Sequence, residues 1–419
     1  MALRVRIVAV IFILCTISPL LASAYSNVQG KEPTRDANAR AEDDFAQETG
    51  VKHKNDKPAE EATDVDFPRQ GGYAQDENQK NGQDHYEGIE NLNPFYNGGG
   101  EEQGQEQPAL KLVEEPIQEA ETPVGLKFNF YQKSCPAAAG IIKKVLQDVS
   151  GQDAGIRASL VRLYSHDCFV QGCDASILLD QNPNGEPTEK TAGANGQFIR
   201  GTEIIDQMKA EIEKACPGVV SCADILTLAT RDALVASGIP NFEIPLGRRD
   251  GLTSIKNKAE HDLPIPTDNV NNMIELFKRK GLNEEDLATL IGAHSIGEAH
   301  CASFGYRTQN PEKIKEMNPK TPLDINHMCW NNMATLPIDS ASHFQMDSLY
   351  YKGLMDKTGI LESDQMIALD PRTTNYVQQY AQDQNGWHQK FTASLIKMSK
   401  IEVLTGNAGQ IRKQCRFVN

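Results

Sequence analysis

Apolar residues recur at helical spacing along the C-terminal part of the chain, from about residue 126 onward. The pattern predicts helices over residues 139–146, 156–169, 204–215, 222–236, 272–280, 286–304 and 387–401. A short strand is expected over residues 242–246, but no regular strand alternation recurs. We therefore expect residues 126–419 to form one mostly α domain without internal repeats.

Several residues fit the expected ends of these helices. Thr267 or Asp268 fits the N-cap of one helix and Asn283 that of the next, because their side chains can accept hydrogen bonds from the first free backbone N–H groups. Acidic residues directly after Asn283 suit the positive end of the helix dipole. Gly281 fits the end of the preceding helix.

The first residues have the pattern of a secretory signal. Two arginines precede an apolar run over residues 7–21, which Pro19 interrupts, and the small residues 22–24 follow. A membrane anchor is the alternative, but the run is short and no basic flank follows it. We predict a signal peptide over residues 1–24 and no membrane association after its removal. A multi-span membrane protein is excluded, because no apolar run reaches the ~20 residues that a bilayer requires.

Residues 25–125 are rich in Glu, Gln, Asn, Asp and Gly and lack periodic apolar positions. Such a segment cannot bury enough apolar surface to offset chain entropy, so we expect a disordered acidic arm. The arm contains 9 basic and 23 acidic residues and so holds −14 of the formal net charge of −15. The remaining domain is nearly neutral, which argues against a nucleic-acid binder with a basic face.

The predicted secretion makes the cysteines candidates for disulfides, because an oxidising compartment does not keep thiols reduced. Cys15 is lost with the signal peptide, and the other eight of the nine cysteines lie in the predicted domain. A secreted domain with eight cysteines is expected to form four disulfides. Eight cysteines allow 105 pairings, so their number alone does not select one.

Arg162 and His166 are four residues apart on one predicted helix and therefore share a face. An imidazole can move a proton while a nearby guanidinium stabilises developing negative charge. Such a pair alone is more often structural. Its neighbourhood, RLYSHDCFVQGCDAS over residues 162–176, is more specific.

This stretch resembles the distal signature of plant secretory (class III) haem peroxidases. Further motifs of that family follow in order: VSCADIL at 220–226, PLGRRDG at 245–251, LIGAHSIG at 290–297, GILESDQ at 359–365 and GQIRKQC at 409–415. The resemblance covers residues 128–419. It implies the plant-type haem peroxidase fold, in which two helical halves sandwich one haem b. It also implies an enzyme that reduces hydrogen peroxide and oxidises small phenolic donors by one-electron steps.

The resemblance assigns roles to five residues. His294 is expected to be the axial ligand of the haem iron, and Asp364 to accept a hydrogen bond from its other ring nitrogen. His166 is expected to move the proton of hydrogen peroxide, with Arg162 stabilising the separating charge. Asn195 is expected to orient His166 through its side-chain carbonyl.

The resemblance also implies two calcium sites built from oxygen ligands, a donor site and a disulfide pattern. The distal calcium set is Asp167, Val170, Gly172, Asp174, Ser176 and Glu189, with Glu189 holding a water. The proximal set is Ser295, Asp339, Ser342, Gln345 and Asp347. The donor site is expected near Pro264. The implied disulfides are Cys135–Cys216, Cys168–Cys173, Cys222–Cys415 and Cys301–Cys329.

One distal position departs from the family. Ser165 stands where an aromatic residue is usual, and we expect it to make the pocket wider and more polar. An alternative function is a non-catalytic haem- and calcium-binding wall protein attached through its acidic, tyrosine-bearing arm. A metal hydrolase using His166, Cys168 and Cys173 is excluded, because secreted cysteines five apart are better explained by a disulfide. We expect a secreted monomer of the cell wall or apoplast whose arm contacts cell-wall polymers.

Overall fold

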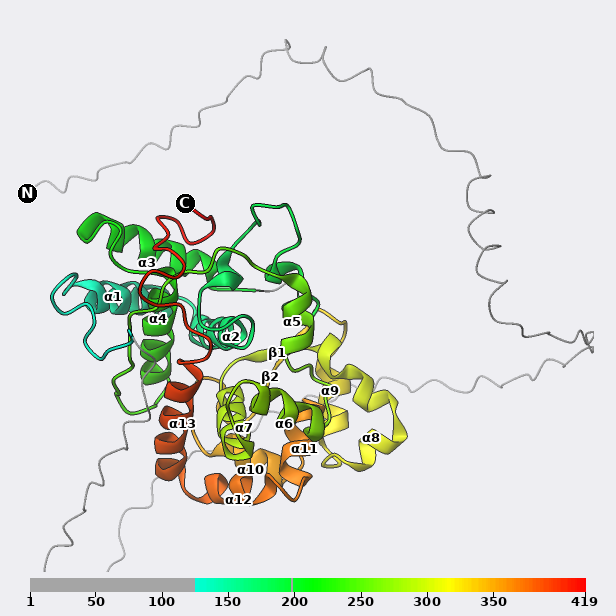
Figure 1. Ribbon diagram of the computed structural model, residues 1–419. Coiled ribbons are helices and arrows are strands. Elements are labelled where there is room, and N and C mark those ends of the chain that lie inside the picture. Colours follow the sequence, from blue (N-terminus) through cyan, green and yellow to red (C-terminus); the bar gives the residue numbers. More distant parts are fainter. Residues whose placement is uncertain (1–124, 197–198) are drawn as a thin grey trace, which may run out of the picture. The chain divides into compact units, whose positions relative to one another are not determined.

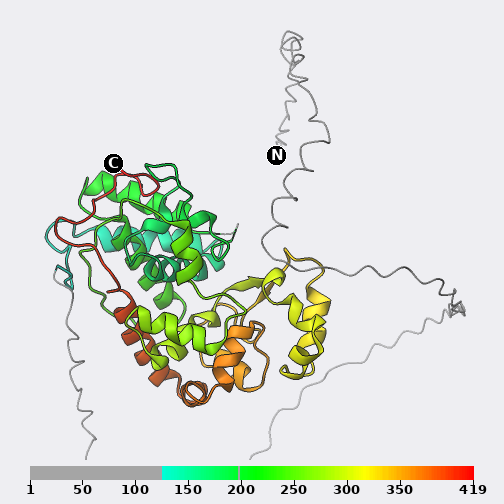
Figure 2. The same ribbon diagram turned by 45° about the vertical axis from the view of Figure 1, so that its right-hand side comes forward.

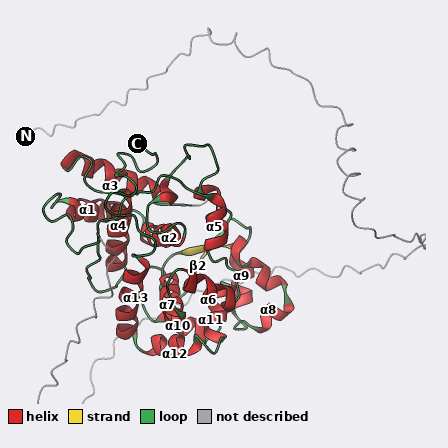
Figure 3. Ribbon diagram, viewed as in Figure 1, coloured by secondary structure: helices red, strands yellow, loops and turns green. Residues whose placement is uncertain are grey.

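The computed structural model describes residues 125–196 and 199–419. The predicted signal peptide and nearly all of the predicted acidic arm lie outside the described residues and stay predictions. The described part is mostly α, as expected (Figures 1 and 3). Its helices are α1 Ala138–Ser150, α2 Gly155–Phe169, α3 Thr202–Ala215, α4 Cys222–Ala236, α5 Lys256–Asp262, α6 Val270–Arg279, α7 Glu284–Leu290, α8 Pro311–Lys315, α9 Thr321–Met328, α10 Leu349–Met355, α11 Glu362–Leu369, α12 Thr374–Gln382 and α13 Gln384–Met398.

The helices form two groups. Helices α1 to α4 pack on one another, with α2 against α4 as a main contact, while α6, α7 and α10 to α13 form the second group (Figures 1 and 2). One cluster of buried apolar residues extends through both groups, from Ile142 and Leu160 to Tyr351 and Trp387. A smaller cluster around Phe304 lies beside α9. This arrangement is the two-halved helical architecture that the resemblance implies.

Four disulfides link these elements. They join Cys135 to Cys216, Cys168 to Cys173, Cys222 to Cys415 and Cys301 to Cys329, the pairs that the resemblance implies. The bond between Cys222 and Cys415 spans 193 residues of sequence and ties the C-terminal segment to the start of α4. Disulfides that close long loops stabilise mainly by restricting the unfolded chain.

The predicted helix over residues 286–304 is wrong beyond Leu290. Helix α7 begins at a capping box in which Asn283 and Asp286 bond each other's backbone N–H, as its sequence suggests. It ends at Leu290, and a 3₁₀ turn, Ile291–Ser295, follows. Gly297 then takes a positive φ of 96°, which an α-helix does not accommodate. The chain continues as strand β1, Glu298–His300, paired antiparallel with β2, Thr335–Pro337.

Two smaller predictions also fail. The N-cap of α6 is Asn269, whose side chain accepts from the N–H of Asn272, rather than Thr267 or Asp268. Residues 242–246 form no strand, because their pairing is limited to a single bridge between Leu246 and Lys127. Helices α5 and α8 to α12 were not predicted, since most are too short for a clear apolar period.

Gly292, in the 3₁₀ turn, has no room for a side chain. An added Cβ would lie 2.4 Å from the Tyr351 hydroxyl and 2.6 Å from the Trp387 ring. We expect Gly292→Ala to lower the free energy of unfolding by about 1–3 kcal/mol through overpacking. Gly140→Ala is the matched control, because a Cβ there meets nothing within 4 Å and alanine favours the helix. Denaturant titration of both variants tests this, and equal stabilities would contradict it.

Candidate active site

The distal residues lie on α2 and the loop that follows the short turn Glu189–Thr191. His166 Nδ1 is 2.6 Å from the side-chain oxygen of Asn195, and the Asn195 amide donates to the Glu189 carbonyl at 2.6 Å. Because the amide nitrogen is engaged, the Asn195 oxygen must accept from His166 Nδ1–H. This assigned tautomer leaves Nε2 of His166 free as a proton acceptor.

Arg162 lies one turn before His166 on the same helix. Its guanidinium donates to the carbonyls of Ala194 at 3.2 Å and Asn195 at 3.3 Å. These bonds hold the positive charge beside the imidazole without pairing it to a carboxylate. Ser165, which precedes His166, donates to the Val161 carbonyl at 3.0 Å and is partly exposed.

The pKa of His166 is lowered to about 3. Burial is the largest cause, the charge of Arg162 is the second, and His294 contributes in the same direction, while the bond to Asn195 opposes them. An imidazole in this setting stays neutral at ordinary pH. It can therefore accept a proton from a weak acid such as hydrogen peroxide.

The proximal residues come from the 3₁₀ turn Ile291–Ser295 and from α11. His294 Nδ1 is 2.9 Å from Oδ2 of Asp364, whose side chain is buried. Burial lowers the pKa of His294, but the charge of Asp364 and the hydrogen bond to it outweigh burial and raise that pKa. The bond leaves Nε2 of His294 available to a metal and strengthens it as a donor.

The distal and proximal side chains are close enough to affect each other's ionisation. The charge of His294 acts to lower the pKa of His166, and the charge of Arg162 acts to lower that of His294. Arg162 and His166 keep accessible surface, and 38% of the His294 side chain is exposed. A free imidazole nitrogen on His294 and a proton acceptor on His166 are the groups that would hold a haem and serve it as a base.

Comparison with known proteins decides the family. A family model described as Peroxidase matches residues 142–383. Peroxidase 9 of Arabidopsis thaliana is 41% identical over 321 residues, covering 71% of this chain and 90% of the relative. The lignin-forming anionic peroxidase of Nicotiana sylvestris is 42% identical over 297 residues, covering 70% of this chain and 91% of the relative.

The chain belongs to the plant class III peroxidases. It is therefore a peroxidase whose family implies a haem cofactor, with hydrogen peroxide and phenolic donors as substrates. The alternative function, a non-catalytic wall protein, is not favoured.

The residues predicted to bind the distal calcium gather at the end of α2. Asp167 and Glu189 are fully buried, and Asp174 and Ser176 lie beside them. Burial raises the pKa of Asp174 to about 6 and, with the charge of neighbouring carboxylates, raises those of Asp167 and Glu189 well above their usual range. Buried carboxylates packed together need a cation.

Unpaired oxygens support the same conclusion. Ser176 Oγ and Glu189 Oε2 are buried and have no hydrogen-bond partner in the described part of the chain. Within those residues, no group of three His, Cys, Asp or Glu side chains is arranged as a metal site. The predicted set does not need one, because hydroxyl and backbone carbonyl oxygens, including those of Val170 and Gly172, supply most of its ligands.

Arg412 is a residue that sequence reasoning missed here. Its buried guanidinium donates to the carbonyls of Ala175 at 2.8 Å and Gly251 at 2.7 Å, and its charge lowers the pKa values of Asp167 and Asp174. One arginine cannot balance this many buried carboxylates. Arg412 lies in the family motif at residues 409–415, but nothing in that motif indicates a hydrogen bond to Ala175, more than 200 residues away.

Four of the five residues predicted to bind the proximal calcium lie on the loop over residues 339–347, and Ser295 ends the 3₁₀ turn that carries His294. Asp339 is buried, which raises its pKa, and it accepts a hydrogen bond from Ser342 Oγ at 3.0 Å. Asp347 adds negative charge next to Asp339, while Gln345 is exposed. The backbone of residues 296–297 pairs with that of residues 343–344 in this loop, which brings the preceding Ser295 near the loop. The structure thus brings Asp339, Ser342 and Asp347 near one another, with a smaller buried charge than at the distal site.

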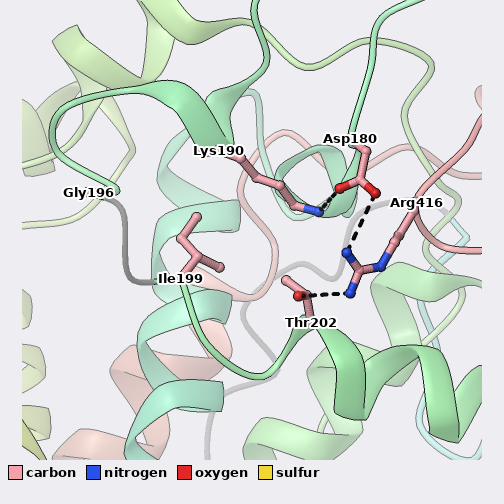
Figure 4. A pocket seen from close by; sticks show the side chains of 6 residues that line it. All are labelled: Asp180, Lys190, Gly196, Ile199, Thr202 and Arg416. Carbon is pink, nitrogen blue, oxygen red and sulfur yellow. Dashed lines mark hydrogen bonds and ion pairs between the residues drawn. The ribbon is translucent and has the colours of Figure 1, made fainter. Parts of the chain in front are cut away.

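Pro264, the predicted donor-site residue, is exposed on the loop between α5 and α6, next to exposed Ile265. A separate surface pocket of about 250 Å³ is lined by Asp180, Lys190, Gly196, Ile199, Thr202 and Arg416 (Figure 4). Its cations are already paired, since Lys190 lies 2.5 Å and Arg416 3.5 Å from Asp180.

No helix of the described residues is long and apolar enough to cross a membrane.

The low pKa of His166 predicts the pH dependence of the reaction with peroxide. His166 acts as a base only when neutral, so the second-order rate constant should stay level from neutral pH down to about 4 and fall as pH drops through about 3. Stopped-flow pH jumps on the haem-loaded enzyme measure this. Asn195→Asp should move the fall to higher pH, since a carboxylate stabilises the imidazolium. A wild-type fall centred near the ordinary histidine pKa of ~6.5 would contradict this assignment.

Proposed function

We propose that this protein is a secreted peroxidase of the cell wall or apoplast that uses one haem b and two calcium ions. Each hydrogen peroxide is reduced to two waters while two phenolic donors each lose one electron and one proton. The radicals then couple, which serves cross-linking, lignification or peroxide removal. The observation that supports the proposal is the presence of two hydrogen-bonded pairs that influence each other's ionisation, His166 with Asn195 beside Arg162 and His294 with Asp364.

Four side chains and one amide divide the work. His294 holds the iron through Nε2, and Asp364 fixes the ring and increases its donor strength. The bound haem supplies the redox chemistry, accepting electrons from donors and passing them to peroxide. His166 Nε2 takes the proton from one oxygen of hydrogen peroxide and gives it to the other oxygen, which leaves as water. Arg162 stabilises the negative charge that develops on the leaving oxygen. Asn195 holds His166 in the required tautomer.

The calcium ions hold the frame in which these groups sit. The distal ion neutralises Asp167 and Asp174 at the end of α2, directly after His166. The distal region is linked to Asn195, because the Glu189 carbonyl accepts the Asn195 amide. The proximal ion lies beside Ser295, which follows the axial histidine. Calcium therefore sets the position of both histidines.

Small phenols reach the haem edge near Pro264. Ser165 leaves the distal side open and more polar than an aromatic residue would. The chain acts as a monomer, and its predicted acidic arm contacts cell-wall polymers.

The absorption spectrum tests the function directly. The purified protein should show a Soret band that shifts when one equivalent of peroxide is added. Arg162→Gln should slow this shift about 10²-fold or more. Arg157→Gln is the matched control, because Arg157 lies on the same helix but donates to the Ala236 carbonyl. A protein without a Soret band, or with a band that peroxide leaves unchanged, would overturn the function.

Calcium removal tests the distal site. Chelation should lower the melting temperature and loosen the distal pocket, because the buried carboxylates then repel one another. Asp174→Asn should reduce the stabilisation that added calcium gives. Asp148→Asn should leave it unchanged, since Asp148 is exposed and paired with Lys144. Differential scanning calorimetry with and without calcium measures both, and equal responses of the two variants would contradict the site.

A further inference from the structure

A row of aromatic rings leads from the axial histidine to the surface. Tyr350 and Tyr351 lie on α10, with ring centroids 5.2 Å apart. Tyr351 and Tyr380 are 5.3 Å apart, and Tyr380 and Tyr376, both on α12, are 6.5 Å apart and stacked. At these distances neighbouring rings are in contact. The row therefore has no gap from α10 to Tyr376.

Its inner end lies against the segment that carries His294. The Tyr351 hydroxyl and the Trp387 ring pack onto Gly292, two residues before His294, so closely that a Cβ there would clash with both. Asp364, the partner of His294, is close enough to Tyr350 to raise its pKa, after the larger effect of burial. The aromatic row thus begins beside the proximal side of the haem site.

Its outer end differs from the rest in exposure. Tyr350, Tyr351 and Tyr380 are buried, whereas Tyr376 is partly exposed. The Tyr351 hydroxyl donates to the Ala288 carbonyl at 2.8 Å, and the Tyr380 hydroxyl lies 2.8 Å from that of Thr289. Neither a carbonyl nor a threonine is a base that could keep a phenol proton. Tyr376 can release its proton to water.

We propose that Tyr376 is a second oxidation site, which serves phenolic groups carried on polymers too large to enter the haem pocket. The proposal rests on the proposed function, because the oxidant is the haem after its reaction with peroxide. One electron passes from Tyr376 through Tyr380, Tyr351 and Tyr350 to the haem, which is reduced by one electron. The Tyr376 proton passes to water.

The Tyr376 phenoxyl radical then takes one electron and one proton from a phenol of the polymer. This restores Tyr376 and leaves the radical on the polymer, where it can couple. Two such cycles use the two oxidising equivalents of one peroxide. The Trp387 ring lies 5.2 Å from that of Tyr351 but outside the row, and it is fully buried. A radical formed on Trp387 is therefore out of reach of a polymer and is reduced again by Tyr351.

Spin trapping locates the radical without relying on activity. The haem-loaded full chain is treated with peroxide and a nitrone spin trap, and the tryptic peptide between Arg372 and Lys390 is sequenced by mass spectrometry. We expect the adduct on Tyr376. It should fall at least fivefold in Tyr380→Phe, which keeps the ring but removes the oxidisable phenol. Tyr306→Phe, outside the row, is the control and should leave the adduct unchanged.

Activity on two donors completes the test. Tyr376→Phe should oxidise a small free phenol at the wild-type rate and lose at least fivefold in rate on phenol groups attached to dextran. Small-phenol turnover without a Tyr376 adduct, an undiminished adduct in Tyr380→Phe, or equal dextran rates in wild type and Tyr376→Phe would each overturn the second site alone. Absence of both small-phenol turnover and adduct would overturn the proposed function as well.

Discussion

The hydrogen bond between His294 and Asp364 is the interaction on which the site depends. It fixes the tautomer of the His294 imidazole, leaves Nε2 free and strengthens it as the proposed ligand of the haem iron. The bond needs the 3₁₀ turn that carries His294 to sit close to α11. In the same turn, Gly292 allows close packing on α10 and α13, because Tyr351 and Trp387 occupy the space of a side chain there. Packing and iron chemistry are thus coupled at one short turn.

The opposite wall is arranged by a different kind of constraint. His166 must remain neutral, and burial together with Arg162 ensures this, while Asn195 selects the tautomer. The next residue, Asp167, is buried among other carboxylates and requires a cation. The proposed calcium site directly after His166 would hold α2 at its C-terminal end. Aromatic packing on Gly292 thus adds to the proximal side a constraint that the distal side does not share.

Sequence reasoning recovered the parts of the fold with long, regular apolar periods, such as α2 and α4. It failed at residues 291–304, where glycines allow a turn and a strand that periodicity does not reveal. The Arg162–His166 pair could be found from helical spacing alone. The role of Asn195 could be predicted only from the family resemblance. Asn195 lies in a loop, 29 residues after its partner His166 on α2, so no local pattern links the two. Arg412 and the aromatic row were not predicted, since their contacts join segments that are far apart in the sequence.

The iron–histidine stretching frequency of the reduced enzyme, measured by resonance Raman spectroscopy, tests the central interaction most directly. In Asp364→Asn the carboxylate is lost while the shape of the side chain is kept, so the account predicts a clear fall in this frequency. Glu362→Gln, which changes a neighbouring carboxylate bonded to Tyr306 and Lys313, should leave it unchanged. A frequency in Asp364→Asn equal to that of the wild type would contradict the account.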